Sequence, residues 1–222
     1  MHVYLFTVRM TINLIVFDFD GTLFDTSEDI TKAINFALNK AGLPPASRTK
    51  VWSSTGDGTS LLVKRILGKN NKHLHNIVLN NFIEYHSPHY ADYTKPMEGV
   101  SDVLEKFKTK KMVILSNKYK EFIDKILKKF EMDKYFSAVY GKESFSKSKP
   151  HPYPLLYTIK KMKVTTQKTI FVGNSLNDVL ISKNANVKCF IIPSNVTPIE
   201  KIEELKPYKI LKNIKELVNF IK

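Results

Sequence analysis

Two aspartates separated by one residue follow an apolar segment near the start of the chain. Residues 12–17 form an apolar, strand-forming run in which only Asn13 is polar, Asp18 and Asp20 follow it, and Gly21 ends the segment. Such a run is typical of a central parallel strand covered on both faces, and ligands of α/β sheets bind beyond the carboxyl ends of these strands. Two neighbouring carboxylates repel each other unless a cation or a shared proton intervenes, so a hard divalent metal ion is their natural partner.

Polar residues also follow other expected strands. Ser116 and Asn117 come after the apolar segment 112–115, where free backbone amides favour an anion, although Ser116 taken alone is more simply interpreted as a plain helix N-cap. Lys149 precedes a helix that begins with proline, and it could either place an ammonium group near the same anion or be a solvated surface lysine. These polar segments follow one another along the chain: the aspartate pair, Ser116 and Asn117, Lys149, and then a Gly-Asn-Ser segment before Asp178. This order favours a single site.

The elements that must position these residues alternate strand and helix, with one interruption. After Thr26 the pattern is helical, with helices expected at 28–41 (N-cap Ser27), 60–67 and 73–85. Further helices are expected at 100–108, 122–130, 149–162, from about 177 and at the end of the chain, and further strands at 112–115, 138–141, 169–172, 189–192 and 209–211. The pattern predicts an α/β fold, a doubly wound parallel sheet with a Rossmann-like core (1–24 and 95–222) and an inserted small helical cap (25–94).

Composition limits the classes of function. The chain has 222 residues and a net charge of +14, almost all from lysine spread along the sequence. No arginine-rich or aromatic-interleaved cluster indicates nucleic-acid binding, so the charge is interpreted as a solvated surface, or as a positive field that steers anionic substrates. The single cysteine, Cys189, is expected in the core, which suits a reducing cytoplasm. No stretch has membrane-spanning length, residues 1–9 lack a signal-peptide cleavage site, and either Met1 or Met10 could be the natural start.

Four segments together resemble a known family. They are DFDGTLFDT, LSNK, SKPHPYPLL and FVGNSLNDV, in this order. They resemble the motifs of the haloacid dehalogenase-like phosphohydrolases, in particular the phosphoglycolate phosphatase branch. The helical insertion with Gly56, Asp57 and Gly58 resembles the cap of that branch, and MEGVSDVL resembles the segment where the chain re-enters the core. A β-phosphoglucomutase-like protein or another small-cap phosphatase is the alternative within the superfamily.

The resemblance implies roles for individual residues. Asp18 would be the nucleophile that becomes an aspartyl phosphate, and Asp20 the acid and base. Asp18, the backbone carbonyl of Asp20 and Asn174 would hold Mg²⁺, with Asp178 as an outer acid that orients metal-bound water or the lysine. The residues implied to bind phosphate or substrate are Ser116, Asn117, Lys149, Thr22, Gly56, Asp57 and Gly58. The implied function is that of a Mg²⁺-dependent phosphatase, monomeric or homodimeric, which hydrolyses a small phosphorylated metabolite such as phosphoglycolate.

Three positions depart from the family pattern. Ser116 replaces the more usual Thr, and Tyr119 stands where a Pro commonly follows the lysine. Asn174 stands where the family has a metal-binding Asp, and its amide oxygen can ligate Mg²⁺ without adding negative charge. Asn174 is consistent with a weakened enzyme, with a non-catalytic phosphate-binding or regulatory homologue, or with an engineered change.

Overall fold

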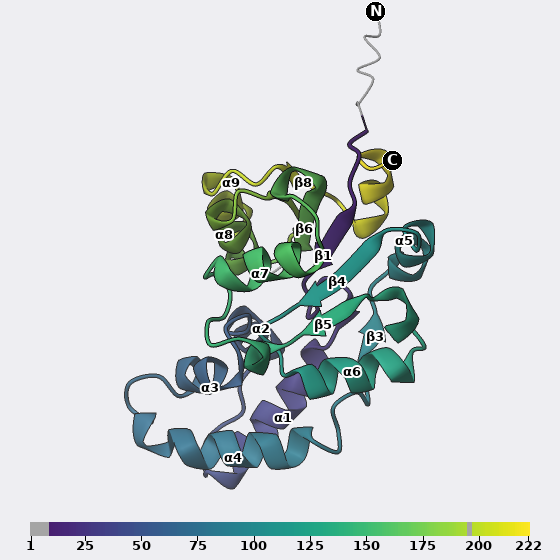
Figure 1. The fold of residues 1–222 in the computed structure, drawn as a ribbon. Helices are drawn as coiled ribbons and strands as arrows, with labels where there is room; N and C mark the ends of the chain where they lie inside the picture. The colour runs from purple at the N-terminus through teal and green to yellow at the C-terminus, as the bar shows by residue number, and fades with distance from the viewer. Residues whose placement is uncertain (1–8, 195–196) are drawn as a thin grey trace, which may run out of the picture.

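The computed structural model describes residues 9–194 and 197–222, and its centre is a six-stranded parallel sheet (Figure 1). The strand order is β5-β4-β1-β6-β7-β8. The strands are β1 (Leu14–Phe17), β4 (Lys111–Leu115), β5 (Ala138–Tyr140), β6 (Thr169–Gly173), β7 (Lys188–Ile191) and β8 (Lys209–Ile210). The first strand of the chain therefore lies between β4 and β6, and its four residues are all buried.

Helices cover both faces of this sheet. One hydrophobic cluster joins the sheet to α5 (Val100–Lys106), α6 (Lys120–Lys129) and the 3-10 helix η5 (Ile214–Asn219). A second cluster joins the opposite face to α7 (Tyr153–Lys161) and α8 (Leu176–Asn184). Successive residues of β1 point to alternate faces, so Ile15 and Phe17 pack in the first cluster and Leu14 and Val16 in the second. The predicted doubly wound α/β fold is confirmed.

Because the strands are parallel, their carboxyl ends share one edge of the sheet. β1, β4 and β6 are adjacent, and Asp18, Ser116 and Asn174 are the residues that immediately follow them. The order of the strands therefore brings together three motifs that are more than fifty residues apart in sequence.

The helical insertion has a hydrophobic cluster of its own. Its helices are α1 (Ser27–Lys40), α2 (Arg48–Ser53), α3 (Thr59–Leu67) and α4 (His75–His86), the last preceded by the 3-10 helix η1 (Lys72–Leu74). Two short antiparallel strands, β2 (Phe24–Asp25) and β3 (Lys95–Pro96), pair where the chain leaves and re-enters the core. The helices lie together at one end of the sheet (Figure 1). The division at residues 24/25 and 94/95 stays a prediction, which the separate cluster supports.

Several predicted boundaries are wrong in detail. Ser27 is the first residue of α1 rather than its N-cap, and the hydroxyl of the N-cap Thr26 donates to Asp20 instead of capping the helix. α7 begins at Tyr153 rather than Lys149, and the terminal helix is a 3-10 helix. The 3-10 helix η1 overlaps the start of the helix predicted at 73–85. The elements that were not predicted are the helices α2 and α9 (Ile199–Glu204), the strands β2 and β3, and the 3-10 helices η2 (Asp133–Tyr135), η3 (Lys142–Ser144) and η4 (Thr166–Lys168).

Cys189 is buried in β7 as expected, and burial raises the pKa of its thiol. Within residues 9–194 and 197–222, none of the helices combines the length and the apolar character that a membrane crossing requires. Residues 1–8, to which most of the signal-peptide prediction refers, lie outside the described part.

Asp29 in α1 ties the cap to the segment that returns to the core. Its carboxylate is 2% exposed and accepts hydrogen bonds from the backbone N–H of Tyr93 and from both the N–H and the hydroxyl of Thr94. We expect Asp29→Ala to lower the free energy of unfolding by about 2 kcal/mol or more, because buried donors lose their acceptor. Chemical denaturation measures this loss. The half-exposed Asp92 pairs with the half-exposed His89, so Asp92→Ala should cost about 0.5 kcal/mol or less, and an equal cost for both variants would contradict the interpretation.

Candidate active site

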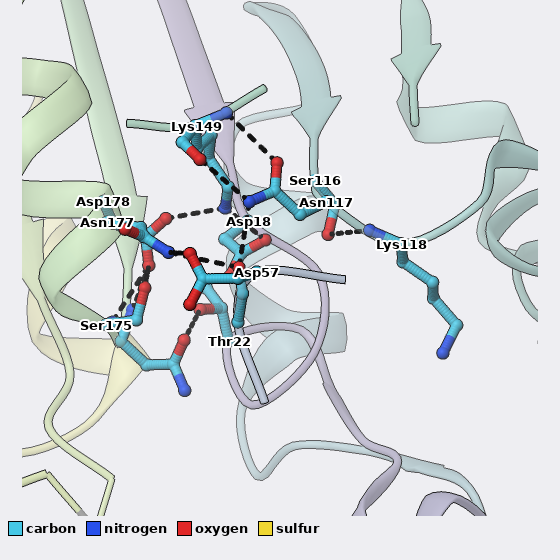
Figure 2. A network of polar contacts seen from close by, with 12 residues as sticks. Asp18, Thr22, Asp57, Ser116, Asn117, Lys118, Lys149, Ser175, Asn177 and Asp178 are labelled. Atoms are coloured by element: carbon cyan, nitrogen blue, oxygen red, sulfur yellow. Dashed lines mark hydrogen bonds and ion pairs between the residues drawn. The ribbon is translucent and has the colours of Figure 1, made fainter. Parts of the chain in front are cut away.

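A buried lysine lies between two buried carboxylates at the centre of the site. Lys149 Nζ is 2.7 Å from Asp18 Oδ1 and 2.7 Å from Asp178 Oδ1 (Figure 2). The three residues are 4%, 7% and 0% exposed, respectively. They come from the loop before α7, the end of β1 and the first turn of α8, so this contact joins three separate segments.

Asp178 is held rigidly from its other side. Its second oxygen, Oδ2, accepts from the N–H of Asn174 (3.1 Å), the N–H of Ser175 (2.9 Å) and the hydroxyl of Ser175 (2.7 Å), which forms a capping box at the N-terminus of α8. A Cβ atom on Gly173 would lie 2.4 Å from the Asp178 carboxyl carbon, so this close approach requires glycine. Both oxygens of Asp178 are therefore engaged, one of them by Lys149; its predicted role of orienting metal-bound water or the lysine stays a prediction.

The charges of this cluster are unbalanced, because two carboxylates share one ammonium group. Burial, reinforced by the Asp178 carboxylate, raises the pKa of Asp18 from 3.8 to about 6 against the opposing effect of Lys149. Burial alone would lower the pKa of Lys149, but the two carboxylates outweigh it and hold that pKa above its ordinary value. Lys149 is therefore positively charged. A further cation beside Asp18 would stabilise the negative charge of its carboxylate.

Asp20 projects into the same cavity from the turn after β1. Its Oδ1 accepts from the Thr26 hydroxyl at 2.7 Å and from Lys118 Nζ at 3.1 Å. The side chain of Lys118 is 7% exposed, so this ion pair is largely shielded from solvent. Gly21, at φ +79°, makes the turn, and a Cβ atom there would lie 2.3 Å from the Asn174 amide nitrogen.

Ser116 and Asn117 follow β4, but their side chains differ in availability. The N-cap of α6 is Tyr119, so Ser116 is not an N-cap; its oxygen accepts only a long contact from Lys118 N–H (3.4 Å) and its own O–H can donate. The Asn117 amide donates to the carbonyls of Gly56 and Lys149, and its oxygen accepts from the N–H of Lys149. Its side chain therefore positions the lysine loop.

Asn174 is 6% exposed, and its side-chain oxygen accepts from the Thr22 hydroxyl at 3.3 Å. No group of three or more His, Cys, Asp or Glu side chains arranged to hold a metal ion occurs in the part of the chain that the structure describes. The ligands that the family resemblance implies are all oxygen donors: the Asp18 carboxylate, the Asp20 backbone carbonyl and the Asn174 amide oxygen. Such a set fits a hard cation that keeps water and substrate ligands, as Mg²⁺ does.

The Gly56–Gly58 loop of the cap contacts the core directly. Asn117 and Asn177 both donate to the Gly56 carbonyl, and Asn177 also donates to Asp57 at 2.7 Å. Asp57 forms an ion pair with Arg65 as well. Gly56 and Gly58 line the cavity, whereas Asp57 holds the loop against α8.

The cavity between core and cap has a volume of about 110 Å³. Asp18, Asp20, Ser116, Asn117 and Asn174 line it from the core. Several residues that line the cavity were not predicted from the sequence. Among them, Lys118 lies in the LSNK segment beside the predicted phosphate-binding residues, and Trp52 and His86 come from the cap. A lone histidine or tryptophan in a helical segment gives no comparable signal.

Three comparisons identify the family. The family model of the haloacid dehalogenase-like hydrolases matches residues 15–192. Phosphoglycolate phosphatase 1 of Pseudomonas aeruginosa is 31% identical in an alignment 213 residues long, which covers 92% of this chain and 78% of that protein. A proposed pyrophosphatase of Caldanaerobacter subterraneus is 29% identical, with 96% of each chain covered.

The fold agrees with these sequence matches. The crystal structure of a protein from Haemophilus somnus, described as a predicted phosphoglycolate phosphatase, superposes with a TM-score of 0.86 at 26% identity and covers 94% of this chain and 97% of that one. The chain therefore belongs to the haloacid dehalogenase-like hydrolase family, in the branch that resembles the phosphoglycolate phosphatases.

Proposed function

We propose that this chain hydrolyses a small phosphomonoester through a covalent intermediate on Asp18, with phosphoglycolate as the first substrate to test. The observation that carries the proposal is the Asp18–Lys149–Asp178 cluster at the edge of the cavity. The lysine holds one oxygen of Asp18, so the carboxylate has a defined orientation toward the cavity. A cytoplasmic location and a monomeric or homodimeric state remain predictions from the sequence.

The residues divide the chemistry among them. A free oxygen of Asp18 attacks phosphorus, while the Ser116 hydroxyl, the Asn117 N–H and Lys149 stabilise charge on the phosphoryl oxygens. Asp20 protonates the leaving oxygen, and afterwards removes a proton from the water that hydrolyses the aspartyl phosphate. Thr26 and Lys118 hold Asp20 in place for both proton transfers.

The same site is suited to Mg²⁺. Asp18, the Asp20 carbonyl and Asn174 would hold the ion, which would supply the positive charge that two carboxylates sharing one ammonium group leave missing. The family generally uses Mg²⁺, and the all-oxygen donor set agrees with this use.

A second candidate function is a weakly active or non-catalytic phosphate-binding protein on the same fold. Asn174 is the residue that favours it, because a neutral ligand attracts a divalent cation less than a carboxylate does. A phosphosugar mutase of the same superfamily is the remaining alternative.

Asp18→Asn tests the covalent mechanism. An amide cannot form the acyl phosphate, so we expect hydrolysis of phosphoglycolate and of an aryl phosphate to fall by about a thousandfold or more. Steady-state rates with and without Mg²⁺ provide the measurement, and circular dichroism checks that the fold is intact. Asp92→Ala, on the exposed surface, is the control. Residual activity near the starting level would rule out Asp18 as the nucleophile.

The same variant tests the charge balance in the metal-free protein. The pKa of Asp18 is raised on folding from 3.8 to about 6, so its charge destabilises the fold progressively as the pH rises through this range. Asp18→Asn removes that charge. In the presence of a chelator, we expect the variant to gain stability relative to the native chain above about pH 6, and to show no such gain below about pH 4. A pH-independent difference in denaturation midpoints would contradict this assignment.

Asn174→Asp tests the metal site and the second candidate together. The substitution restores a carboxylate of nearly the same size, so we expect the half-saturating Mg²⁺ concentration to fall on the order of tenfold and the rate to rise. Titration of activity with Mg²⁺, supported by calorimetry of Mg²⁺ binding, measures both. Unchanged affinity and rate would show that Asn174 is not a ligand, whereas Mg²⁺ binding by both proteins without turnover would favour the non-catalytic function.

A further inference from the structure

The helix α7 presents apolar side chains to solvent as well as to the sheet. Leu155 and Ile159 are buried against the sheet, as expected for a helix that covers it (Figure 1). Tyr153, Leu156 and Tyr157, by contrast, are 45%, 43% and 39% exposed. Spacings of three and four residues place them together on one side of the helix, and we call these three side chains the α7 patch.

The two tyrosines of the α7 patch are held in place by other aromatic rings. Phe145, in the segment before α7, packs edge-on against Tyr153 at a centroid distance of 5.9 Å and against Tyr157 at 5.2 Å. Tyr140 of the edge strand β5 contacts Tyr157 at 6.1 Å. Side chains that are already ordered lose little conformational entropy on binding, and tyrosine is among the residues that contribute most to protein interfaces. The patch is therefore a contiguous and ordered apolar surface, unlike a single exposed side chain.

The charge around the α7 patch is positive. Residues 144–177 contain six lysines and no aspartate or glutamate. Lys160 and Lys161 follow the patch by one turn of the helix, Lys147 lies in the loop before α7, and all three are exposed. None of the three forms an ion pair in the part of the chain that the structure describes, whereas lysines of α6 pair with acidic residues one turn away. The lysines beside the patch therefore have no acidic partner in their own segment.

This lysine rim determines which kind of partner fits. Two copies of the surface would repel each other, because each surrounds its apolar centre with positive charge only. Nucleic acid fits less well, because residues 144–177 contain no arginine and the rings of Tyr153 and Tyr157 are inclined at 49° instead of forming a parallel stacking platform. An acidic protein segment fits both features, since carboxylates can pair with the lysines while an apolar side chain covers the patch.

We propose that the α7 patch binds a partner protein, through an acidic segment of that partner with a large apolar side chain between its carboxylates. The patch lies outside the candidate active site, because none of its residues lines the cavity. α7 nevertheless begins shortly after Lys149, so the partner would lie next to the loop that carries this lysine. The inference does not depend on the proposed phosphatase function.

Selection of random peptides displayed on phage, with the native chain as the target, tests the proposal without presupposing a sequence. We expect the enriched peptides to be negatively charged and to carry at least one large apolar residue flanked by Asp or Glu. A synthetic, fluorescein-labelled copy of the most enriched peptide then serves as the probe, and fluorescence anisotropy measures its affinity. This affinity should fall as the NaCl concentration rises, because salt screens charges at the surface.

Two double variants separate the apolar and the charged contributions. Tyr153→Gln with Leu156→Gln removes two of the three apolar side chains, and Lys160→Glu with Lys161→Glu reverses the charge beside them. Each double variant should weaken binding of the probe on the order of tenfold or more, since apolar anchors and complementary charges both contribute to binding. Glutamine and glutamate are good helix formers, so α7 should persist, and circular dichroism checks this.

Matched variants elsewhere control for total apolar surface and for net charge. Ile77→Gln with Tyr208→Gln removes two exposed apolar side chains far from α7 in sequence, and Lys69→Glu with Lys72→Glu makes the same change in net charge within the cap. Both control variants should bind the probe with nearly the affinity of the native chain.

Several results would overturn the inference. A selection without enrichment of acidic peptides, or a probe affinity that either α7 double variant retains, would rule out the proposed chemistry. Equal weakening by the α7 variants and their controls, or equal affinity for a charge-matched polyglutamate, would indicate unspecific attraction to a lysine-rich chain. Tighter binding of a charge-matched oligothymidylate or of phosphatidylserine vesicles, lost in the α7 variants, would assign the surface to nucleic acid or to a membrane instead.

Discussion

The contact of Lys149 with Asp18 and Asp178 is the interaction on which the rest of the site depends. Each of the three residues is expensive to bury alone, and together they still carry one uncompensated negative charge. The fold tolerates this arrangement because each carboxylate is also held by its own segment, with Asp178 bound to the N-terminus of α8 and Asp18 placed by β1. The remaining charge is the physical reason why a cation and an anionic substrate would bind together rather than separately.

The same cluster links the sheet to the cap. The Asn117 side chain binds the backbone of Lys149, and its amide N–H also donates to the Gly56 carbonyl of the cap. The loop that carries the lysine and the loop that closes the cavity are therefore held by one side chain. Asn177 and Asp57 strengthen this contact from α8. Movement of the cap away from the core would therefore break a hydrogen bond made by the same Asn117 side chain that holds the backbone of Lys149.

Much of the fold and the position of the site could be predicted from the sequence, for reasons that particular residues make clear. Residues 14–17, within the segment predicted at 12–17, form a central strand because an apolar run must be covered on both faces, and motifs that follow parallel strands must meet at one edge. The roles of Asn117 and Asp57 could not be predicted, because their partners are backbone carbonyls and side chains far away in sequence. The N-cap of α1 was misplaced for a related reason: the Thr26 hydroxyl serves Asp20, and Ser27 pairs with Asp25.

Asn174 is the residue at which the candidate site departs most from the charge pattern of its family. Under the proposed function it would hold the metal ion, which acts on any phosphate ester, so a neutral ligand there would lower turnover without regard to the leaving group. The uncompensated charge of the Asp18–Lys149–Asp178 cluster acts in the opposite direction, since it attracts a cation whether residue 174 is charged or neutral.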